Sequence, residues 1–281
     1  MSTAYWNQVR SAEMAVPTDR PLADLTAELT TLLGSTDPVE RDEIAYPILA
    51  TWISAGVYDD LLPGLGDGMA AGLTQGLGES GTPSVFRRSF SALVLAACIH
   101  RDNAASLLPG GTLLEWGDRA TGWLVRERDA RGFVPGQGWA HAIAHGADVL
   151  DELARSAHFG LNELTVLLDV IADRVLEPTN VVWTSGEPDR LATAAMSVFR
   201  RRLVPLRVIE PWLARIAAAA CDRGPAGTDP FLTSGNPEAF LRALHLQVAL
   251  APEPVAVRAD LLLSVVDALR TTNAVYLKPP T

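Results

Sequence analysis

Apolar residues recur at three- and four-residue spacing along most of this chain, whereas runs of alternating β-branched residues are nearly absent. This pattern predicts an all-α fold. The clearest helix start is Asp37-Pro38, because Asp37 can cap the helix, Pro38 suits its first position and Glu40 can reach back to the cap. We expect that helix to run to about Gly56. A following helix, over 59–79, contains several glycines, each of which costs about 1 kcal/mol relative to alanine in an exposed helix interior.

Several later helices open with the same local sequence, a glycine two residues before a proline, as in Gly81-Thr82-Pro83. Together with Trp139, these prolines predict first helices that start about 45 to 56 residues apart, at Pro38, Pro83, Trp139, Pro188 and Pro237. A second helix fits inside each interval, over 59–79, 111–129, 161–176, 208–222 and 254–271. The prediction is one domain over 1–281, with an N-terminal cap helix over 22–34, about five antiparallel helix pairs over 37–271 and a tail over 272–281. Its architecture would be a HEAT- or armadillo-like solenoid, with an α/α toroid as the alternative.

Charge and cysteine content narrow the possible partners and compartment. The formal net charge of −10 disfavours nucleic acid or an anionic membrane as the main partner. Two cysteines, Cys98 and Cys221, exclude a disulfide framework and a cysteine-rich zinc site. The N-terminal sequence has no signal-peptide pattern, and no stretch has the roughly 18 uninterrupted apolar residues of a spanning helix. We therefore expect a cytoplasmic protein.

The segment over 129–152 holds the candidate chemistry. A glycine-rich loop over 129–138 leads into a predicted helix that starts at Trp139 and carries two of the five histidines. On a helix, four polar side chains would fall within roughly 60° of one another and four apolar ones on the opposite face. The polar group is His141, His145, Asp148 and Glu152, and the apolar group is Ile143, Ala147, Leu150 and Ala154.

The first interpretation of this stripe is acid–base catalysis by His141, His145 and Asp148. A carboxylate one turn after His145 can fix the tautomer of an imidazole and stabilise its protonated form, while the second imidazole moves a second proton. Around them, Phe133 and Trp139 would wall a pocket and Arg131 would neutralise a developing anion. Glu152 could orient an imidazole, and the 129–138 loop could close as a lid.

Two other interpretations of the stripe stay open. It could be the solvated face of an amphipathic helix, which is the usual role of polar stripes. It could also bind zinc, since histidines at i and i+4 with Asp148 have suitable spacing. Three ligands fall short of a structural zinc site, so we expect no metal and less than stoichiometric zinc. Trp183, Glu187 and Arg190 are weaker candidates that could line the same pocket or act only in packing, capping and ion pairing.

The string RGFVPGQGWAHAIAHGAD, followed by VLDELA, resembles the signature of an uncharacterised bacterial domain-of-unknown-function family. The resemblance extends loosely over most of the chain, through the segment that begins at Gly186. It implies a helical-repeat fold and no particular activity.

Two functional hypotheses follow. The first is an enzyme that acts on a small, largely apolar molecule by histidine acid–base chemistry without a cofactor, in the manner of a dehydratase, isomerase or cyclase of a biosynthetic pathway. The second is a non-catalytic helical-repeat protein that binds a ligand or a protein partner, as such folds commonly do.

Overall fold

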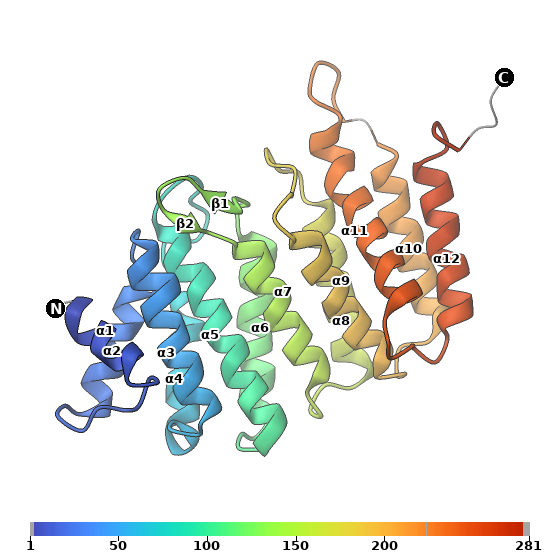
Figure 1. Ribbon diagram of the computed structural model, residues 1–281. Helices are drawn as coiled ribbons and strands as arrows, with labels where there is room; N and C mark the ends of the chain where they lie inside the picture. Colours follow the sequence, from blue (N-terminus) through green and yellow to red (C-terminus); the bar gives the residue numbers. More distant parts are fainter. Residues whose placement is uncertain (1–2, 223, 278–281) are drawn as a thin grey trace. The chain divides into compact units, whose positions relative to one another are not determined.

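Helices account for nearly all of the regular structure in the computed structural model, which describes residues 3–222 and 224–277 (Figure 1). The predicted all-α class is confirmed. Contacts between residues divide the chain into two units, unit 1 over Met1–Val149 and unit 2 over Leu150–Thr281. Within the described residues, no helix combines the length and the apolar character needed to cross a membrane.

Unit 1 contains short N-terminal helices followed by longer ones and a small β-hairpin. Its elements are α1 (Thr3–Ser11), α2 (Leu22–Leu32), the π-helix η1 (Val39–Ala45), α3 (Tyr46–Ser54), the 3₁₀ turn η2 (Asp59–Leu61), α4 (Leu62–Gly72), α5 (Ser84–Ala105), α6 (Gly110–Arg126), β1 (Phe133–Val134) and β2 (Gly138–Trp139). Helix α7 (Ala142–Arg155) begins in unit 1 and ends in unit 2.

The core of unit 1 forms where α3 and α4 pack against α5, and α4 packs against α6. Large aromatic side chains fill it, including the fully buried Trp52, Phe86 and Trp116. One of the α4 glycines is required by this packing. A Cβ at Gly66 would lie 2.0 Å from the ring of Trp116, so only glycine lets the two helices approach this closely.

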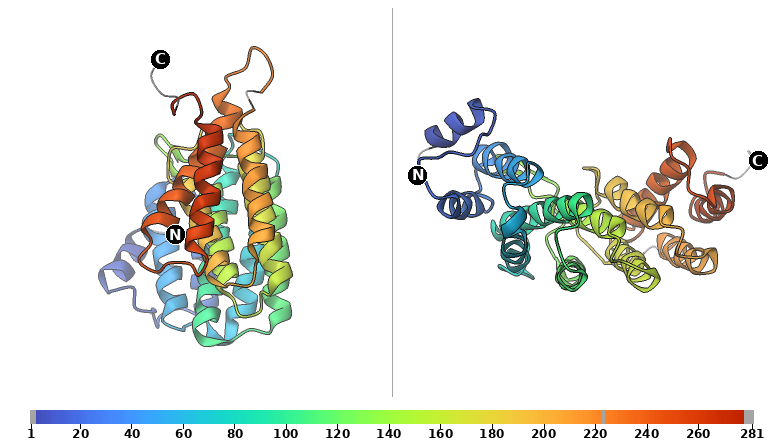
Figure 2. Two further views of the ribbon diagram at one scale, coloured as in Figure 1. Left: turned by 90° about the vertical axis from the view of Figure 1, so that its right-hand side faces the viewer. Right: turned by 90° about the horizontal axis from the view of Figure 1, so that it is seen from below.

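Unit 2 repeats one packing pattern along its helices, α8 (Leu161–Leu176), α9 (Glu187–Arg200), α10 (Leu206–Ala220), α11 (Phe231–Leu250) and α12 (Arg258–Thr272). Helix α9 packs on α8 and α11, and α10 packs on α8, α11 and α12. Figure 2 shows the two resulting layers within the unit, with α9 and α11 on one side and α8 and α10 on the other. Trp212 on α10 joins the layers, because its ring meets Phe199 and Phe240 edge-on while its indole N–H donates to Leu168 O at 2.7 Å.

The helix positions predicted from periodicity agree closely with α6, α8, α10 and α12, and the predicted cap helix agrees with α2. Two boundaries in these regions were wrong, and one helix is of a different type. Helix α4 ends at Gly72, because Gly76 and Gly78 have positive φ angles of 62° and 96°. Helix α11 starts at Phe231 and contains Pro237, and the helix predicted after Pro38 begins as a π-helix.

The third predicted helix also starts later than expected. Trp139 lies in β2, and α7 begins only at Ala142. Gly136 and Gly138 have φ angles of 76° and 78°, which favour a tight turn over a helix at this point. The prediction that His141 lies within the helix is therefore wrong.

Candidate functional site

The hairpin of β1 and β2 is the only pair of strands in the described residues, and it leads directly to the histidines. Its strands are antiparallel, with Phe133 opposite Trp139 and Val134 opposite Gly138. At Gly138 the backbone runs very close to η1, since a Cβ there would lie 2.8 Å from both Arg41 Nη2 and Pro38 Cβ. The position therefore requires glycine for both its conformation and its contacts.

Arg41, on the π-helix η1, fixes the turn of this hairpin from inside the unit. Its side chain is fully buried and donates to Ser35 O and to Gln137 O, at 2.6 Å each. The guanidinium also pairs with Asp42 at 2.7 Å and lies 4.1 Å from the ring centre of Phe86. Burial lowers the pKa of Arg41 and raises the pKa of Asp42. The charge of each residue acts on the other in the opposite direction, but burial is the larger effect for both. An ion pair between a fully buried arginine and a partly exposed aspartate thus anchors the turn.

A second ion pair, which is fully buried, contacts the chain that enters the hairpin. Arg88 on α5 and Glu127 after α6 are both fully buried, with Arg88 Nε 2.6 Å from Glu127 Oε2. Glu127 also accepts the indole N–H of Trp123 and the backbone N–H of Asp129, at 2.9 Å each. This carboxylate therefore ties α5 and α6 to the chain that enters the hairpin.

Asp129 and Arg131 continue this network. The Asp129 carboxylate is fully buried and accepts bonds from the Arg131 guanidinium at 2.6 to 3.1 Å and from the Gly81 N–H at 2.9 Å. Arg131 also donates to Thr82 O at 2.9 Å. The residue predicted to neutralise a substrate anion thus holds the loop in place, with about a quarter of its side chain exposed.

Five aromatic rings follow one another from the hairpin surface into the core. Phe133 meets Trp139 edge-on at 5.0 Å, and Trp139 stacks on His141 with ring centres 4.2 Å apart and an interplanar angle of 24°. His141 meets His145 edge-on at 5.7 Å, and His145 meets Phe90 at 5.0 Å. Phe133 and Trp139 are 56% and 39% exposed, whereas His145 is 4% exposed, so the row connects solvent to a buried imidazole.

His141 has an unusual backbone conformation, with φ of 48° in the left-handed region. Such a conformation costs of order 1–3 kcal/mol in most residues other than glycine, and histidine is among the types that adopt it more often. Four other non-glycine residues of the described chain share it, namely Glu13, Met14, Ser106 and Arg202. Its N–H donates to Arg131 O at 3.1 Å, and its carbonyl accepts the His145 N–H at 2.9 Å. His141 is thus the residue that precedes α7, and its ring position is set by the hairpin and the helix together.

His145 is oriented by Ser89, a fully buried residue of α5. Its Nδ1 lies 2.8 Å from Ser89 Oγ and 3.2 Å from Ser89 O. Because a carbonyl oxygen only accepts hydrogen bonds, the second contact favours the tautomer with the proton on Nδ1. In that tautomer Nε2 is the basic nitrogen.

The remaining predicted site residues lie on α7, on α9 and in the segment that precedes α9. Asp148 and Glu152 are half-buried on α7, in unit 1 and unit 2 respectively. Trp183 and Glu187 are buried in unit 2, where the backbone N–H of Trp183 donates to Asn236 Oδ1 at 2.8 Å and the carboxylate of Glu187 accepts the backbone N–H of Ser185 at 2.9 Å. Arg190 is half-buried on α9.

Sequence reasoning missed the residues that support the histidines, namely Arg41, Arg88, Ser89, Glu127 and Asp129. A usable signal existed for two of them, because Arg88 and Ser89 interrupt the apolar pattern of α5 at positions that face its core. Buried polar residues of this kind need partners. Among the described residues, no three histidine, cysteine or acidic side chains are grouped so that they could hold a metal ion.

Comparison with known proteins gives one match. No curated protein and no solved structure matches the chain. One family of proteins matches over residues 73–246, a range that includes the hairpin, both site histidines and Ser89. Because this match covers more than half of the chain, the protein belongs to the family described as "Protein of unknown function (DUF2785)".

Proposed function

We propose that this protein is an enzyme that acts on a small molecule at the hairpin and uses His141 and His145 to transfer protons. The observation that carries the proposal is the continuous row from Trp139 through His141 and His145 to Ser89. At one end of this row Ser89 fixes the tautomer of His145, and at the other end the exposed ring of Trp139 stacks on His141. Dehydration, isomerisation and ring closure are the reaction types that need only such groups.

The surroundings of the two histidines suit different roles. Burial disfavours a charged imidazole, which suits His145 to act as a neutral base through Nε2. The face of an indole ring attracts a cation, and Trp139 lies flat against His141. His141 would therefore act as the acid. Two titratable groups in contrasting environments are the usual arrangement for paired acid–base catalysis.

The ion pairs around the hairpin also support the proposal. Arg41 with Asp42 holds its turn, and the fully buried pair of Arg88 with Glu127 holds the chain that enters it. Such a network is costly to desolvate. The network would nevertheless serve catalysis, because it holds the reacting groups in place before the substrate binds.

The proposal can be tested by incubating the protein with the small-molecule fraction of a bacterial extract and measuring which metabolites decrease. We expect at least one metabolite to be consumed by the wild type and by His245→Gln, a matched variant of a histidine in unit 2. Turnover should fall about 10²–10⁴-fold in His141→Gln and His145→Gln. Equal consumption by all four proteins, or by none, would contradict the proposal.

A non-catalytic ligand-binding protein is the second candidate. It is favoured by one observation, namely that the exposed members of the row, Phe133 and Trp139, are aromatic rings suited to binding, whereas His145 is almost fully buried. Under this alternative, a metabolite would copurify with the wild type and be lost in Trp139→Ala, but would not be converted. The same extract experiment therefore distinguishes the two candidates.

A further inference from the structure

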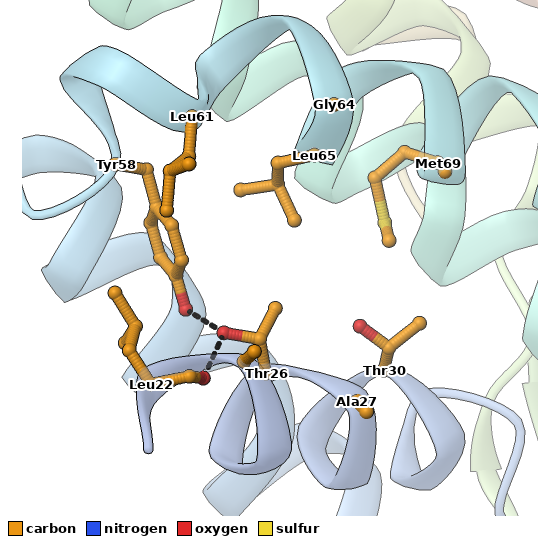
Figure 3. A pocket seen from close by; sticks show the side chains of 11 residues that line it. Leu22, Thr26, Ala27, Thr30, Tyr58, Leu61, Gly64, Leu65 and Met69 are labelled. Carbon is orange, nitrogen blue, oxygen red and sulfur yellow. Dashed lines mark hydrogen bonds between the residues drawn. The ribbon is translucent and has the colours of Figure 1, made fainter.

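A largely apolar pocket of about 370 Å³ lies in unit 1 between α2 and α4, and it shares no residue with the histidine site (Figure 3). Leu65 and Met69 form its α4 wall, and Thr26 and Thr30 face them from α2. Its volume is within the range of 300–1,000 Å³ typical of small-molecule sites.

Two glycines of α4 contribute to this pocket without being needed for packing. A Cβ at Gly64 or Gly68 would meet no atom within 4 Å, whereas one at Gly66 or Gly72 would collide with Trp116 or Ser91. Glycine in the interior of an exposed helix is destabilising relative to alanine. Glycine at positions 64 and 68 therefore makes α4 less stable, although no close contact in the unit requires it. What the two glycines leave is open space beside the helix.

Hydroxyl groups supply the polar part of the wall. Thr26 Oγ1 donates its only proton to Leu22 O at 2.8 Å, so the hydroxyl of Tyr58, also at 2.8 Å, must donate to Thr26 (Figure 3). The Tyr58 oxygen then keeps lone pairs that can accept a bond. Burial raises the pKa of Tyr58 to about 12, so this hydroxyl stays neutral at physiological pH.

Thr30 differs from its neighbours on the same helix. Thr26 and Thr31 each donate to the carbonyl four residues earlier, at 2.8 and 2.9 Å. The Thr30 hydroxyl makes no hydrogen bond within the described part of the chain, and it lies on the pocket wall. It is thus free to donate to, or accept from, a bound molecule.

We infer that this pocket is a second binding site, for a neutral and mostly apolar small molecule that carries a single hydrogen-bond donor such as a hydroxyl or an amine N–H. The donor is received by the Tyr58 oxygen or by Thr30, and the apolar part lies between Leu65, Met69 and the two glycines. No charged side chain lines the pocket. The acidic residues Asp60 and Asp67 lie beside lining residues in the sequence, and the chain carries a net charge of −10, so an anionic ligand is disfavoured.

The inference is tested with N-phenyl-1-naphthylamine, a neutral apolar fluorophore with one N–H, titrated into the full-length protein. We expect saturable binding of one molecule and a Kd at least tenfold weaker in Gly68→Leu, whose new side chain would fill the pocket. Gly122→Leu is the matched control, because Gly122 is a half-exposed glycine inside α6 where a Cβ meets only Arg126 Nη2, at 3.8 Å. It should bind like the wild type. Unsaturable binding, or equal affinity in Gly68→Leu and wild type, would overturn the inference.

Competition tests the class of ligand. Decanol should displace the fluorophore at a concentration at least tenfold lower than decanoate at pH 8, because only the carboxylate is charged. Equal displacement by the two would contradict a site for neutral molecules. Neither measurement depends on His141 or His145. A failure of the pocket inference would therefore leave the proposed acid–base chemistry untouched, and the reverse also holds.

Discussion

The carboxylate of Glu127 gives the sharpest prediction about what holds the hairpin. It receives two hydrogen bonds from the Arg88 guanidinium, at 2.6 and 2.8 Å, one from the Trp123 indole and one from the Asp129 backbone. Both charged side chains are fully buried. The substitution Glu127→Ala would therefore leave the Arg88 charge buried without its counter-ion.

Removal of one partner from such a pair typically lowers the free energy of unfolding by about 3–5 kcal/mol, because it leaves the other charge buried and uncompensated. Replacement of both partners by apolar residues is often neutral or stabilising. We expect Glu127→Ala to lower the free energy of unfolding by that amount, measured by urea denaturation with tryptophan fluorescence. Arg155→Ala is the control. It removes a half-exposed partner of Asp151 on α7, and exposed helix pairs contribute about 0.3–0.5 kcal/mol.

A loss below about 1 kcal/mol in Glu127→Ala would refute the reasoning, because it would mean that water or another residue compensates the Arg88 charge. The double variant Arg88→Met/Glu127→Leu sharpens the test. It removes both charges, so it should be more stable than Glu127→Ala alone. If it were less stable, the cost would arise from lost packing and not from an uncompensated charge.

Further predictions concern α4 and its neighbours. Gly68→Ala should raise the free energy of unfolding by up to about 1 kcal/mol, because alanine favours the helix and its Cβ meets no neighbour. Gly66→Ala should lower the free energy of unfolding, because its Cβ would collide with Trp116. Thermal denaturation of the two variants should therefore show shifts of opposite sign. Asp59 pairs with Arg101 at 2.7 Å, and this hydrogen-bonded guanidinium lowers the pKa of the carboxyl below its ordinary 3.8. Its stabilising contribution is present above pH 3.8 and is lost as the pH falls through the lowered pKa, so Asp59→Asn should reduce Tm more at pH 7 than at pH 3. Equal reductions at both pH values would contradict this assignment.

Periodicity predicted the helices well where local sequence and tertiary packing agree. The apolar spacing of α8, α10 and α12 matches the faces that they bury, so their positions followed from sequence. It failed at Trp139, because two glycines with positive φ angles and the close approach of Arg41 favour a hairpin over an extra helical turn. Neither effect is visible in a pattern of apolar residues.

The proximity of the two histidines could be predicted from sequence, but their partners could not. Their spacing placed His141 and His145 on one face of a helix, and in the structure their rings do meet, although His141 precedes the helix. Ser89 is 56 residues away from His145. A contact at such a distance depends on how α5 packs against α7, and this packing is not encoded in any local motif.

The central claim is that His141 and His145 move protons to and from a bound small molecule. It is tested most directly by incubating the protein with bacterial metabolites in D₂O and measuring, by mass spectrometry, both deuterium that becomes bonded to carbon and metabolites whose mass falls by one water. The account predicts that the wild type labels or dehydrates at least one metabolite and that His141→Gln and His145→Gln, with unchanged circular dichroism, do neither. The absence of both changes with the wild type, or equal changes with all three proteins, would contradict it.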